Sequence, residues 1–431
     1  MKNLLRLIFI IALSATASGC RSVNSISPEL AAKIKADGRL DSVRIRAERL
    51  VATGLNAGDG YEEVWIRDLN TFITLACEVG DRKQLRKALV RFFQFQGSTG
   101  DIPDGYVPIR GDMTGYDYRY TQLAPGLAAH KNTVETDQES SLIQAVYKYV
   151  KATNDCSLLN EVIDGRTVLQ RMSDALSYLL SERYNVTYGL LWGATTADWG
   201  DVQPEHPWGV ALDDSSHLAI DIYDQAMFLI AVNNYTELAN DPAEEQKWES
   251  LSDLFRKNIR KHLWDAPRNK YIPHIYLKDS PFSSDFDENE IYYHGGTAIA
   301  IEAGLHTAEE VLTAYKTMES NRIAAQANSI GLTMYPPYPE GEFLNTGMGP
   351  YCYQNGGDWT WFGGRMIQQL INYGYYEEAY CSLIPMVERV LVNDGFYEWW
   401  TPAAEPRGSG SFRGSAGVLW DAIKALQAVA E

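Results

Sequence analysis

Apolar residues recur at helical spacing through most of the chain. Leu142, Val146 and Val150 are four residues apart, and residues 366–371 group their apolar positions on one helical face. Alternating apolar and polar runs, which are typical of half-buried strands, are few. The pattern therefore predicts an all-α fold with twelve helices. Their expected ranges are 27–52, 66–79, 82–97, 136–153, 157–183, 215–238, 242–263, 296–304, 307–319, 357–373, 376–392 and 414–430.

Short connections between several of these helices predict antiparallel pairs. Gly80-Asp81 and Gly374-Tyr375 leave room only for tight turns, so the helices form six hairpins. Longer loops rich in Trp, Tyr, Asp, Gly and Pro lie between the pairs, and long loops usually carry function. If the hairpins close into a toroid, these loops form one pocket, although an open helical solenoid has the same periodicity. The loops are 98–135, 188–214, 265–295, 330–356 and 393–413.

The first residues have the three parts of an export signal. Lys2 and Arg6 supply positive charge, an apolar run follows, and small residues at 17–19 stand directly before Cys20. The run is shorter than the roughly 20 residues that a membrane-spanning helix needs. The small residues with the cysteine resemble the lipobox of bacterial lipoproteins. This resemblance implies a signal peptide at 1–19, an acylated Cys20, and a location at the periplasmic face or the outer membrane.

The remaining chain reads as one acidic domain. No Pro/Ser-rich linker or abrupt change of composition interrupts residues 27–431, which predicts a single domain after a short tether at 20–26. Removal of Lys2 and Arg6 with the signal peptide changes the formal net charge from −18 to −20. Nucleic acids and anionic lipids select basic surfaces, so this charge argues against both as partners. We expect a monomer that touches the membrane only through the lipid on Cys20.

The sequence gives no sign of a cofactor or a metal site. Cys77, Cys156, Cys352 and Cys381 have no C-x-x-C spacing, and neither an HExxH motif, a P-loop nor a dinucleotide fingerprint occurs. After export these four cysteines could pair in three ways, or remain buried free thiols.

Two motifs at expected helix starts are candidate sugar-binding sites. In Trp65-Ile66-Arg67-Asp68, the arginine could donate to sugar hydroxyls and the aspartate could accept from them. The second motif, at residues 134–140, contains Asp137, which could contact a substrate. The alternative for both motifs is structural: an acid or an ion pair in the first turn stabilises the N-terminus of a helix electrostatically.

A central loop contains a candidate general acid. Asp198 and Asp201 flank Trp199 in the segment Ala-Asp-Trp-Gly-Asp. A carboxyl group held against apolar surface has a raised pKa and stays protonated near neutral pH, as a general acid must. The alternative for either aspartate is an Asx-type turn.

The late part of the chain contains a second candidate group. Gln354 and Asn355 offer donors and acceptors next to two glycines that permit close approach of a ligand, and Trp359 follows. One helical hairpin later, Glu398 stands among aromatic residues beside Trp399. Aromatic faces bind the C–H surfaces of pyranoses and carboxylates move protons, so this acid is a candidate general base. The alternative is an exposed glutamate in a surface aromatic patch.

The order of these motifs resembles that of six-hairpin glycoside hydrolases. The closest pattern is that of the neutral/alkaline invertase family, whose late motif is similar to Tyr-His-Asn-Gly-Gly-Ser-Trp. This sequence also resembles the processing α-glucosidase and glucoamylase families, but more loosely. The matching segments, besides an aspartate in the central loop, are Trp-Ile-Arg-Asp at 65–68, Tyr-Gln-Asn-Gly-Gly-Asp-Trp at 353–359, Asp-Gly-Phe-Tyr-Glu at 394–398 and Ser-Ala-Gly at 415–417.

This resemblance implies an (α/α)6 toroid and an inverting glycosidase that needs no cofactor or metal. Carried over by motif, Asp198 is the general acid and Glu398 the general base, with Asp201 as the fallback acid. Arg67 and Asp68 would bind the sugar at the cleaved end of an oligosaccharide. The central loop around residues 206–208 matches none of these families, which leaves the sugar undefined.

Three other functions remain open at this point. An unsaturated-uronide hydrolase also uses a helical toroid and would need a free cation for the substrate carboxylate. A sugar epimerase would be expected to use a histidine pair. A surface lipoprotein could bind glycans through the same aromatic loops without cleaving them.

Overall fold

The computed structural model of the chain describes residues 25–431. The predicted signal peptide, the lipidated Cys20 and most of the tether lie outside the described residues. Within the described part, no helix is both long enough and apolar enough to cross a membrane.

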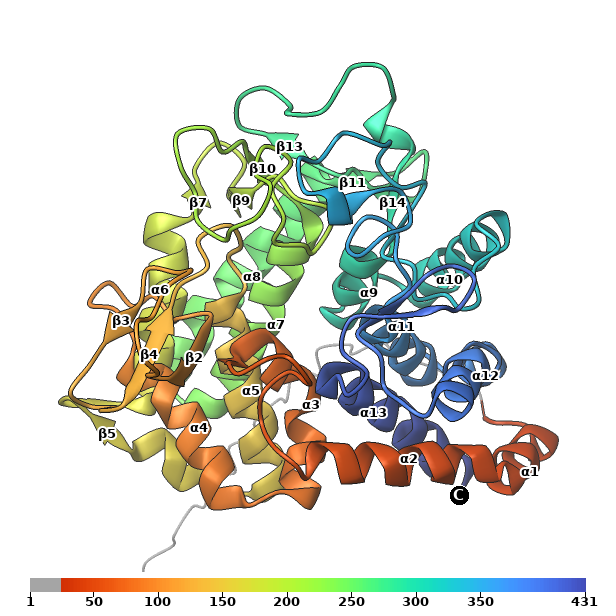
Figure 1. Cartoon of the computed structure of the whole chain (residues 1–431), viewed down its shortest axis with the longest axis horizontal. Coiled ribbons are helices and arrows are strands. Elements are labelled where there is room, and N and C mark those ends of the chain that lie inside the picture. Colours follow the sequence, from red (N-terminus) through yellow and green to blue (C-terminus); the bar gives the residue numbers. More distant parts are fainter. Residues whose placement is uncertain (1–24) are drawn as a thin grey trace, which may run out of the picture.

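Six helices form a closed inner ring. Each packs against the next along the chain, and the last of them packs against the first (Figure 1). These inner helices are α3 (Ile66–Val79), α5 (Gln138–Thr153), α7 (Ile222–Ala239), α9 (His294–Glu302), α11 (Thr360–Asn372) and α13 (Arg413–Ala430). The predicted all-α (α/α)6 toroid is confirmed, and the closing contact between α13 and α3 excludes an open solenoid.

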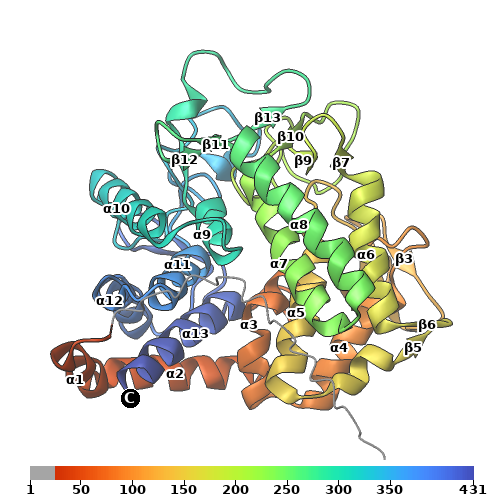
Figure 2. The ribbon, with the colours of Figure 1, turned by 180° about the vertical axis from the view of Figure 1, so that it is seen from behind.

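A second set of helices covers the outside of the ring. Figure 2 shows α6 and α8 on one side of it and α10 and α12 on the other. The outer helices are α2 (Gly38–Val51), α4 (Arg82–Gln94), α6 (Val168–Glu182), α8 (Pro242–His262), α10 (Ala308–Ala324) and α12 (Tyr376–Asn393), and α1 (Pro28–Ala36) packs beside α13.

The two sets differ in which faces they bury. In α7 nearly every position from Ile222 to Val232 is buried, because neighbours cover the helix on all sides. In α4 the buried Leu85, Leu89 and Phe93 form one stripe opposite a charged face. This is the amphipathic pattern of a helix that covers a core.

Three predicted helices are wrong in extent because local capping chemistry divides or shortens them. The predicted helix 215–238 begins only at Ile222, with Asp221 as its N-cap, because residues 218–220 form a short strand. The predicted helix 27–52 is divided at Asp37, whose carboxylate accepts from Arg39 N at 3.1 Å and begins α2. In the predicted helix 157–183, Asp164 and Gly165 both have positive φ and turn a short β-hairpin. The helix α6 begins only after it, with Thr167 as its N-cap.

The remaining regular structure consists of very short strands in the loops. These strands pair within the loops that connect the helices and do not enter the ring. They are β1 (Val64–Trp65), β2 (Gly105–Pro108), β3 (Arg119–Tyr120), β4 (Leu127–His130), β5 (Val162–Ile163), β6 (Arg166–Thr167), β7 (Tyr184–Asn185), β8 (Leu190–Leu191), β9 (Gly193–Ala194), β10 (Leu218–Ile220), β11 (Trp264–Asp265), β12 (Lys270–Tyr271), β13 (Ile275–Tyr276), β14 (Tyr292–Tyr293), β15 (Met334–Tyr335), β16 (Trp399–Trp400) and β17 (Pro406–Arg407).

The four cysteines of the described part are all free thiols. Cys77 is buried, Cys352 is half-buried, and Cys156 and Cys381 are exposed. The alternative of free thiols therefore holds over disulfides, but the expected burial is wrong for the two exposed cysteines.

A buried ion pair fastens the late loops to the outer helix α12. Arg389 Nη1 lies 2.9 Å from Asp358 Oδ1, and the two side chains are only 2% and 0% exposed. Ser329 Oγ donates to both carboxylate oxygens of Asp358, and Arg389 Nη2 donates to Thr360 Oγ1 at 2.7 Å. Segments before α11, after α10 and within α12 are thereby joined.

We expect Asp358→Ala to lower the free energy of unfolding by about 3–5 kcal/mol, because it leaves the buried Arg389 charge without its partner. Chemical denaturation measures the loss. As the matched control, Glu405→Ala removes the exposed partner of Arg407 and should change stability by less than about 1 kcal/mol. Equal losses in the two variants would contradict the role of the buried pair.

Candidate active site

A cavity of about 210 Å³ lies among the loops that precede the inner helices. The starts of α3, α11 and α13 contribute to its wall, and so do the central loop and the Glu398 segment. Residues far apart in the sequence therefore share one small space. Its lining residues are Tyr61, Trp65, Arg67, Asp68, Asp104, Tyr116, Trp199, Asp201, Val210, Tyr353, Gln354, Trp359, Trp361, Glu398 and Phe412.

Glu398 lines this cavity and is only 5% exposed. Tyr61 Oη donates to Glu398 Oε2 at 2.8 Å, and the backbone N–H of Ser409 donates to the same oxygen at 3.2 Å. Burial raises the pKa of the Glu398 carboxyl, while these two hydrogen bonds act in the opposite direction. A Cβ at Gly408 would overlap the carboxylate, which explains a glycine in the Gly/Ser-rich stretch.

Asp201 lines the cavity together with Glu398. Its Oδ1 accepts a hydrogen bond of 2.7 Å from Gln354 Nε2, so the central loop is joined to the late loop at this point. Gly200 makes this possible, because a Cβ there would overlap Gln354 Oε1. The structure thus brings the fallback acid of the sequence analysis, and not Asp198, to the same cavity as Glu398.

Asp198 lies outside this cavity and is 1% exposed. Its carboxylate accepts from Gly296 N at 2.9 and 3.0 Å, and it lines a separate space of about 10 Å³ on the inner side of the loop. Trp199 lines both spaces. Burial raises the pKa of Asp198 to about 8, as expected for a general acid, but a proton donor must also reach the substrate. The family motif pointed to Asp198, whereas Asp201 lines the cavity. The two could not be told apart by sequence, because both are acids close to Trp199.

Arg67 and Asp68, the two candidate sugar-binding residues in the first turn of α3, both line the cavity. The guanidinium of Arg67 is paired with Glu135, and its Nε lies 2.8 Å from Asp137 Oδ2. Asp137 is fully buried and also accepts from Tyr223 Oη at 2.9 Å, so it holds Arg67 in place and does not line the cavity.

Two acids in the wall have strongly raised pKa values. Burial raises the pKa of Asp68 to about 8 and that of Asp104 to about 7, while the Arg67 charge acts in the opposite direction on both. Asp68 Oδ1 is buried without a hydrogen-bond partner among the described residues. A carboxyl group kept neutral in this way can donate a hydrogen bond as well as accept one.

The other predicted binding residues divide into two groups. Trp65, Trp199 and Trp359 line the cavity, and the rings of Trp199 and Trp359 meet edge to face at 4.9 Å. Asn355 does not line the cavity. Its side-chain amide instead makes hydrogen bonds with backbone groups of the neighbouring loop, including one of 2.7 Å from Tyr338 N. Trp399 also lies outside the lining.

Sequence reasoning did not assign Tyr61, Asp104 or Tyr116 to the site. Asp104 and Tyr116 belong to the long loop 98–135, which was expected to carry function but contains none of the recognised motifs. Tyr61 has no sequence signal of its own, since its role follows from the approach of the α2–α3 connection to Glu398.

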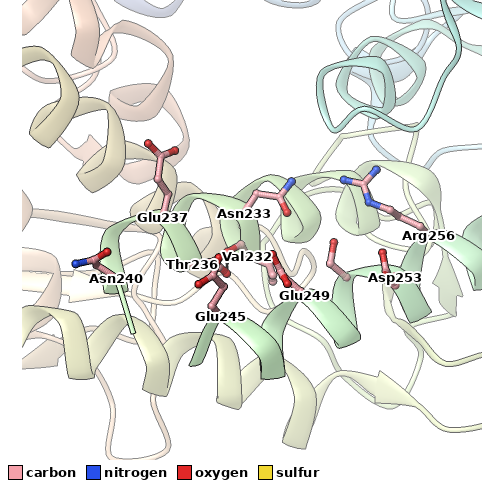
Figure 3. Close-up of a pocket in the computed structure, with 10 residues that line it drawn as sticks. Val232, Asn233, Thr236, Glu237, Asn240, Glu245, Glu249, Asp253 and Arg256 are labelled. Atoms are coloured by element: carbon pink, nitrogen blue, oxygen red, sulfur yellow. Dashed lines mark hydrogen bonds between the residues drawn. The ribbon is translucent and has the colours of Figure 1, made fainter. Parts of the chain in front are cut away.

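A larger cavity lies elsewhere in the described chain. It measures about 690 Å³ and lies in the groove between α7 and α8, where Figure 3 shows the carboxylates of Glu237, Glu245, Glu249 and Asp253 with Arg256 at one end. No aromatic side chain lines this cavity in the described chain, and none of its acids is surrounded by apolar side chains. Size alone therefore does not identify the reactive site.

Comparison with solved structures finds enzymes with the same architecture. The GH63 mannosylglycerate hydrolase from Thermus thermophilus in complex with glucose has a TM-score of 0.60 and 14% identity, covering 88% of this chain and 99% of that one. The rhamnosidase from Klebsiella oxytoca with rhamnose bound has a TM-score of 0.58 and 13% identity. The match covers 89% of this chain and 63% of the rhamnosidase.

A third similar structure is the GH78 family rhamnosidase of Bacillus sp. GL1. Its TM-score is 0.58 with 14% identity, over 89% of this chain and 34% of that one. The chain has the fold of these glycoside hydrolases. No family of related sequences and no curated protein matches it.

We expect Tyr61→Phe to raise the pKa of the Glu398 carboxyl by about one pH unit. The lost hydrogen bond favours the ionised form, and a bond to a charged group contributes about 1.5–3 kcal/mol before water replaces part of it. A carboxyl-carbon NMR titration of Glu398 in both proteins measures the change. An unchanged or lowered pKa would contradict the assigned hydrogen bond.

Proposed function

We propose that this protein is a glycoside hydrolase that inverts the anomeric configuration, with Asp201 as the general acid and Glu398 as the general base. The observation that carries the proposal is the meeting of these two carboxyl groups in one aromatic-lined cavity. The shared fold with glycoside hydrolases supports it. Asp201 replaces Asp198 as the assigned acid because only Asp201 lines the cavity.

The reaction follows from the two carboxyl groups. Asp201 gives its proton to the glycosidic oxygen while the bond from that oxygen to the anomeric carbon breaks. Glu398 takes a proton from a water molecule whose oxygen bonds to the anomeric carbon from the opposite face. The sugar product is released with inverted configuration, and proton exchange with solvent restores both groups.

The hydrogen bonds at each carboxyl group determine which of its two oxygens is free to act on the substrate. Gln354 donates to Asp201 Oδ1, so we assign the transferred proton to Oδ2. Tyr61 and Ser409 both donate to Glu398 Oε2, which favours its ionised form and directs Oε1 to the water.

The remaining wall suits a sugar ring. Trp65, Trp199 and Trp359 offer aromatic surface for pyranose C–H groups. Asp68 and Asp104 offer carboxyl groups for sugar hydroxyls, and a neutral carboxyl group can donate as well as accept. We therefore assign a sugar residue to this cavity and the rest of the oligosaccharide to its mouth.

The rival functions are supported less well. An epimerase was expected to use a histidine pair, and no histidine of the described chain lines the cavity. A uronide hydrolase needs a free cation, but Arg67, the one arginine of the described chain that lines the cavity, is already paired with Glu135 and Asp137. A binding protein has no need for two carboxyl groups held in different hydrogen-bonding environments at one site.

We expect Asp201→Asn and Glu398→Gln each to lower kcat by about 10²–10⁴-fold, because each removes one proton transfer. Steady-state kinetics on an oligosaccharide substrate measures the loss, with thermal unfolding to show that the fold is retained. A Glu398→Gln enzyme with a near-normal rate would overturn the assignment of the base.

The anomer released in the first turnovers tests the stereochemistry separately. A panel of α- and β-linked oligosaccharides, followed by proton NMR before mutarotation, should give a product of configuration opposite to that of the bond cleaved. Retention of configuration would mean that one carboxylate attacks the sugar directly, and it would exclude the proposed mechanism.

A further inference from the structure

The loop that carries the proposed acid is fastened to α9 by Asp198. Tyr293, the N-cap residue of α9, makes no side-chain capping bond. Instead, both oxygens of Asp198 accept from Gly296 N, the free backbone donor at the third position of the helix. A residue 98 positions earlier in the chain thus caps this helix.

Two glycines make this approach possible. A Cβ at Gly295 would lie 2.6 Å from Asp198 Oδ2 and 2.9 Å from Trp199 Cδ1, and a Cβ at Gly296 would lie 2.7 Å from Asp198 Oδ1. Real Cβ atoms do not come so close to other atoms. The start of α9 is therefore shaped to receive the central loop, and any side chain there would push Asp198 and Trp199 outward.

The backbone of the loop is held in a conformation that needs such support. Asp198 has φ of +56°, in the left-handed region, which costs a residue with a side chain about 1 kcal/mol or more. Gly200 N donates to Ala197 O at 3.0 Å and closes a tight turn around Asp198 and Trp199. The next residue after this turn is Asp201.

The outer end of the loop is fixed by the cavity wall. Trp199 packs among Trp359, Trp361 and Phe362, with ring centroids 4.8–5.2 Å apart. Asp201 is held by Gln354, as described above. The loop is thus fastened on its inner side by the carboxylate of Asp198 and on its outer side by contacts in the site.

We propose that Asp198 is a positioning residue, whose carboxylate on the N-terminus of α9 fixes the turn that presents Asp201 to the glycosidic oxygen. The role rests on the proposed function, because it acts through Asp201. It requires an oxygen acceptor at this position and not an acid. Asparagine, which has the same shape and one amide oxygen, can accept from Gly296 N in the same way.

Substrates that differ in their need for an acid separate positioning from a general loss of structure. Cleavage of an oligosaccharide needs protonation of the leaving oxygen, whereas a glycosyl fluoride of the same sugar releases fluoride without it. Displacement of Asp201 should therefore slow the first substrate far more than the second, whereas a general disturbance of the site should slow both alike.

The test compares Asp198→Asn, Asp198→Ala and Gly295→Ala with Asp201→Asn on both substrates. We expect Asp198→Ala and Gly295→Ala to lose about 100-fold or more in kcat on the oligosaccharide and less than about 10-fold on the fluoride, with little change in KM for Asp198→Ala. Asp201→Asn should show the same selective loss. Asp198→Asn, the conservative variant, should restore kcat on the oligosaccharide to within about 3-fold of the native enzyme.

Gly38→Ala is the matched glycine control, since no atom lies within 4 Å of a Cβ at Gly38, and it should leave both rates unchanged. If Asp198→Ala does not fold, Gly295→Ala and Asp198→Asn still test the proposal. An Asp198→Asn enzyme as impaired as Asp201→Asn would overturn the proposal, because Asp198 would then be needed as an acid. Equal losses on both substrates in Gly295→Ala would overturn it as well.

Failure of the proposed function has a different result. It would appear as full activity of Glu398→Gln, or as no selective loss in Asp201→Asn, whatever the Asp198 variants do.

Discussion

The packing of α13 against α3 is the constraint on which the rest of the structure depends. Gly417 of α13 lies so close to α3 that a Cβ there would overlap the backbone of Phe72. The ring closes only because this position has no side chain. Arg413, at the start of α13, then donates from its backbone to Ala57 O at 2.7 Å and from Nη1 to Asn56 O at 2.9 Å.

Closure brings the two ends of the chain together at the cavity. Tyr61, before α3, reaches Glu398, which lies 337 residues later. The six inner helices also begin at the loop end of the ring, so their first turns and the preceding loops supply Arg67, Asp68, Trp359 and Phe412. An open arrangement of the same hairpins would leave these residues on separate surfaces, with no shared space for a sugar.

Burial gives the acids of this region different roles according to what their oxygens bind. Glu398 receives two hydrogen bonds that favour its ionised form, as a base requires. The Asp137 carboxylate is paired with Arg67, and the Asp198 carboxylate caps the N-terminus of α9. Asp201 is half-buried and borders the cavity, so of the two central aspartates it is the one that we propose for proton transfer. A raised pKa is therefore not sufficient to identify a catalytic acid.

The regular apolar period and the short hairpin turns predicted the paired helices, whereas the toroid followed only from the resemblance to six-hairpin glycoside hydrolases. Local motifs pointed to Glu398, Arg67 and Trp359, which line one cavity in the structure. The sequence could not predict closure, which depends on the fit of Gly417 to a helix that starts some 350 residues earlier. Asp198 and Asp201 are three residues apart in the same loop, and which of them faces the cavity depends on the left-handed turn at Asp198 and on contacts with Gly296 and Gln354, which are distant in the sequence. Asn355 and Asp137 looked like ligand-binding residues because buried polar groups that hold loops have the same composition as those that hold sugars.

A crystal structure of the Glu398→Gln enzyme with an uncleaved oligosaccharide would test the central claim most directly. The account predicts a sugar ring in the cavity beside Trp199 and Trp359, with the glycosidic oxygen within about 3.2 Å of Asp201 Oδ2 and a water molecule at residue 398. An oligosaccharide bound outside this cavity, or a glycosidic oxygen placed out of reach of Asp201, would contradict it.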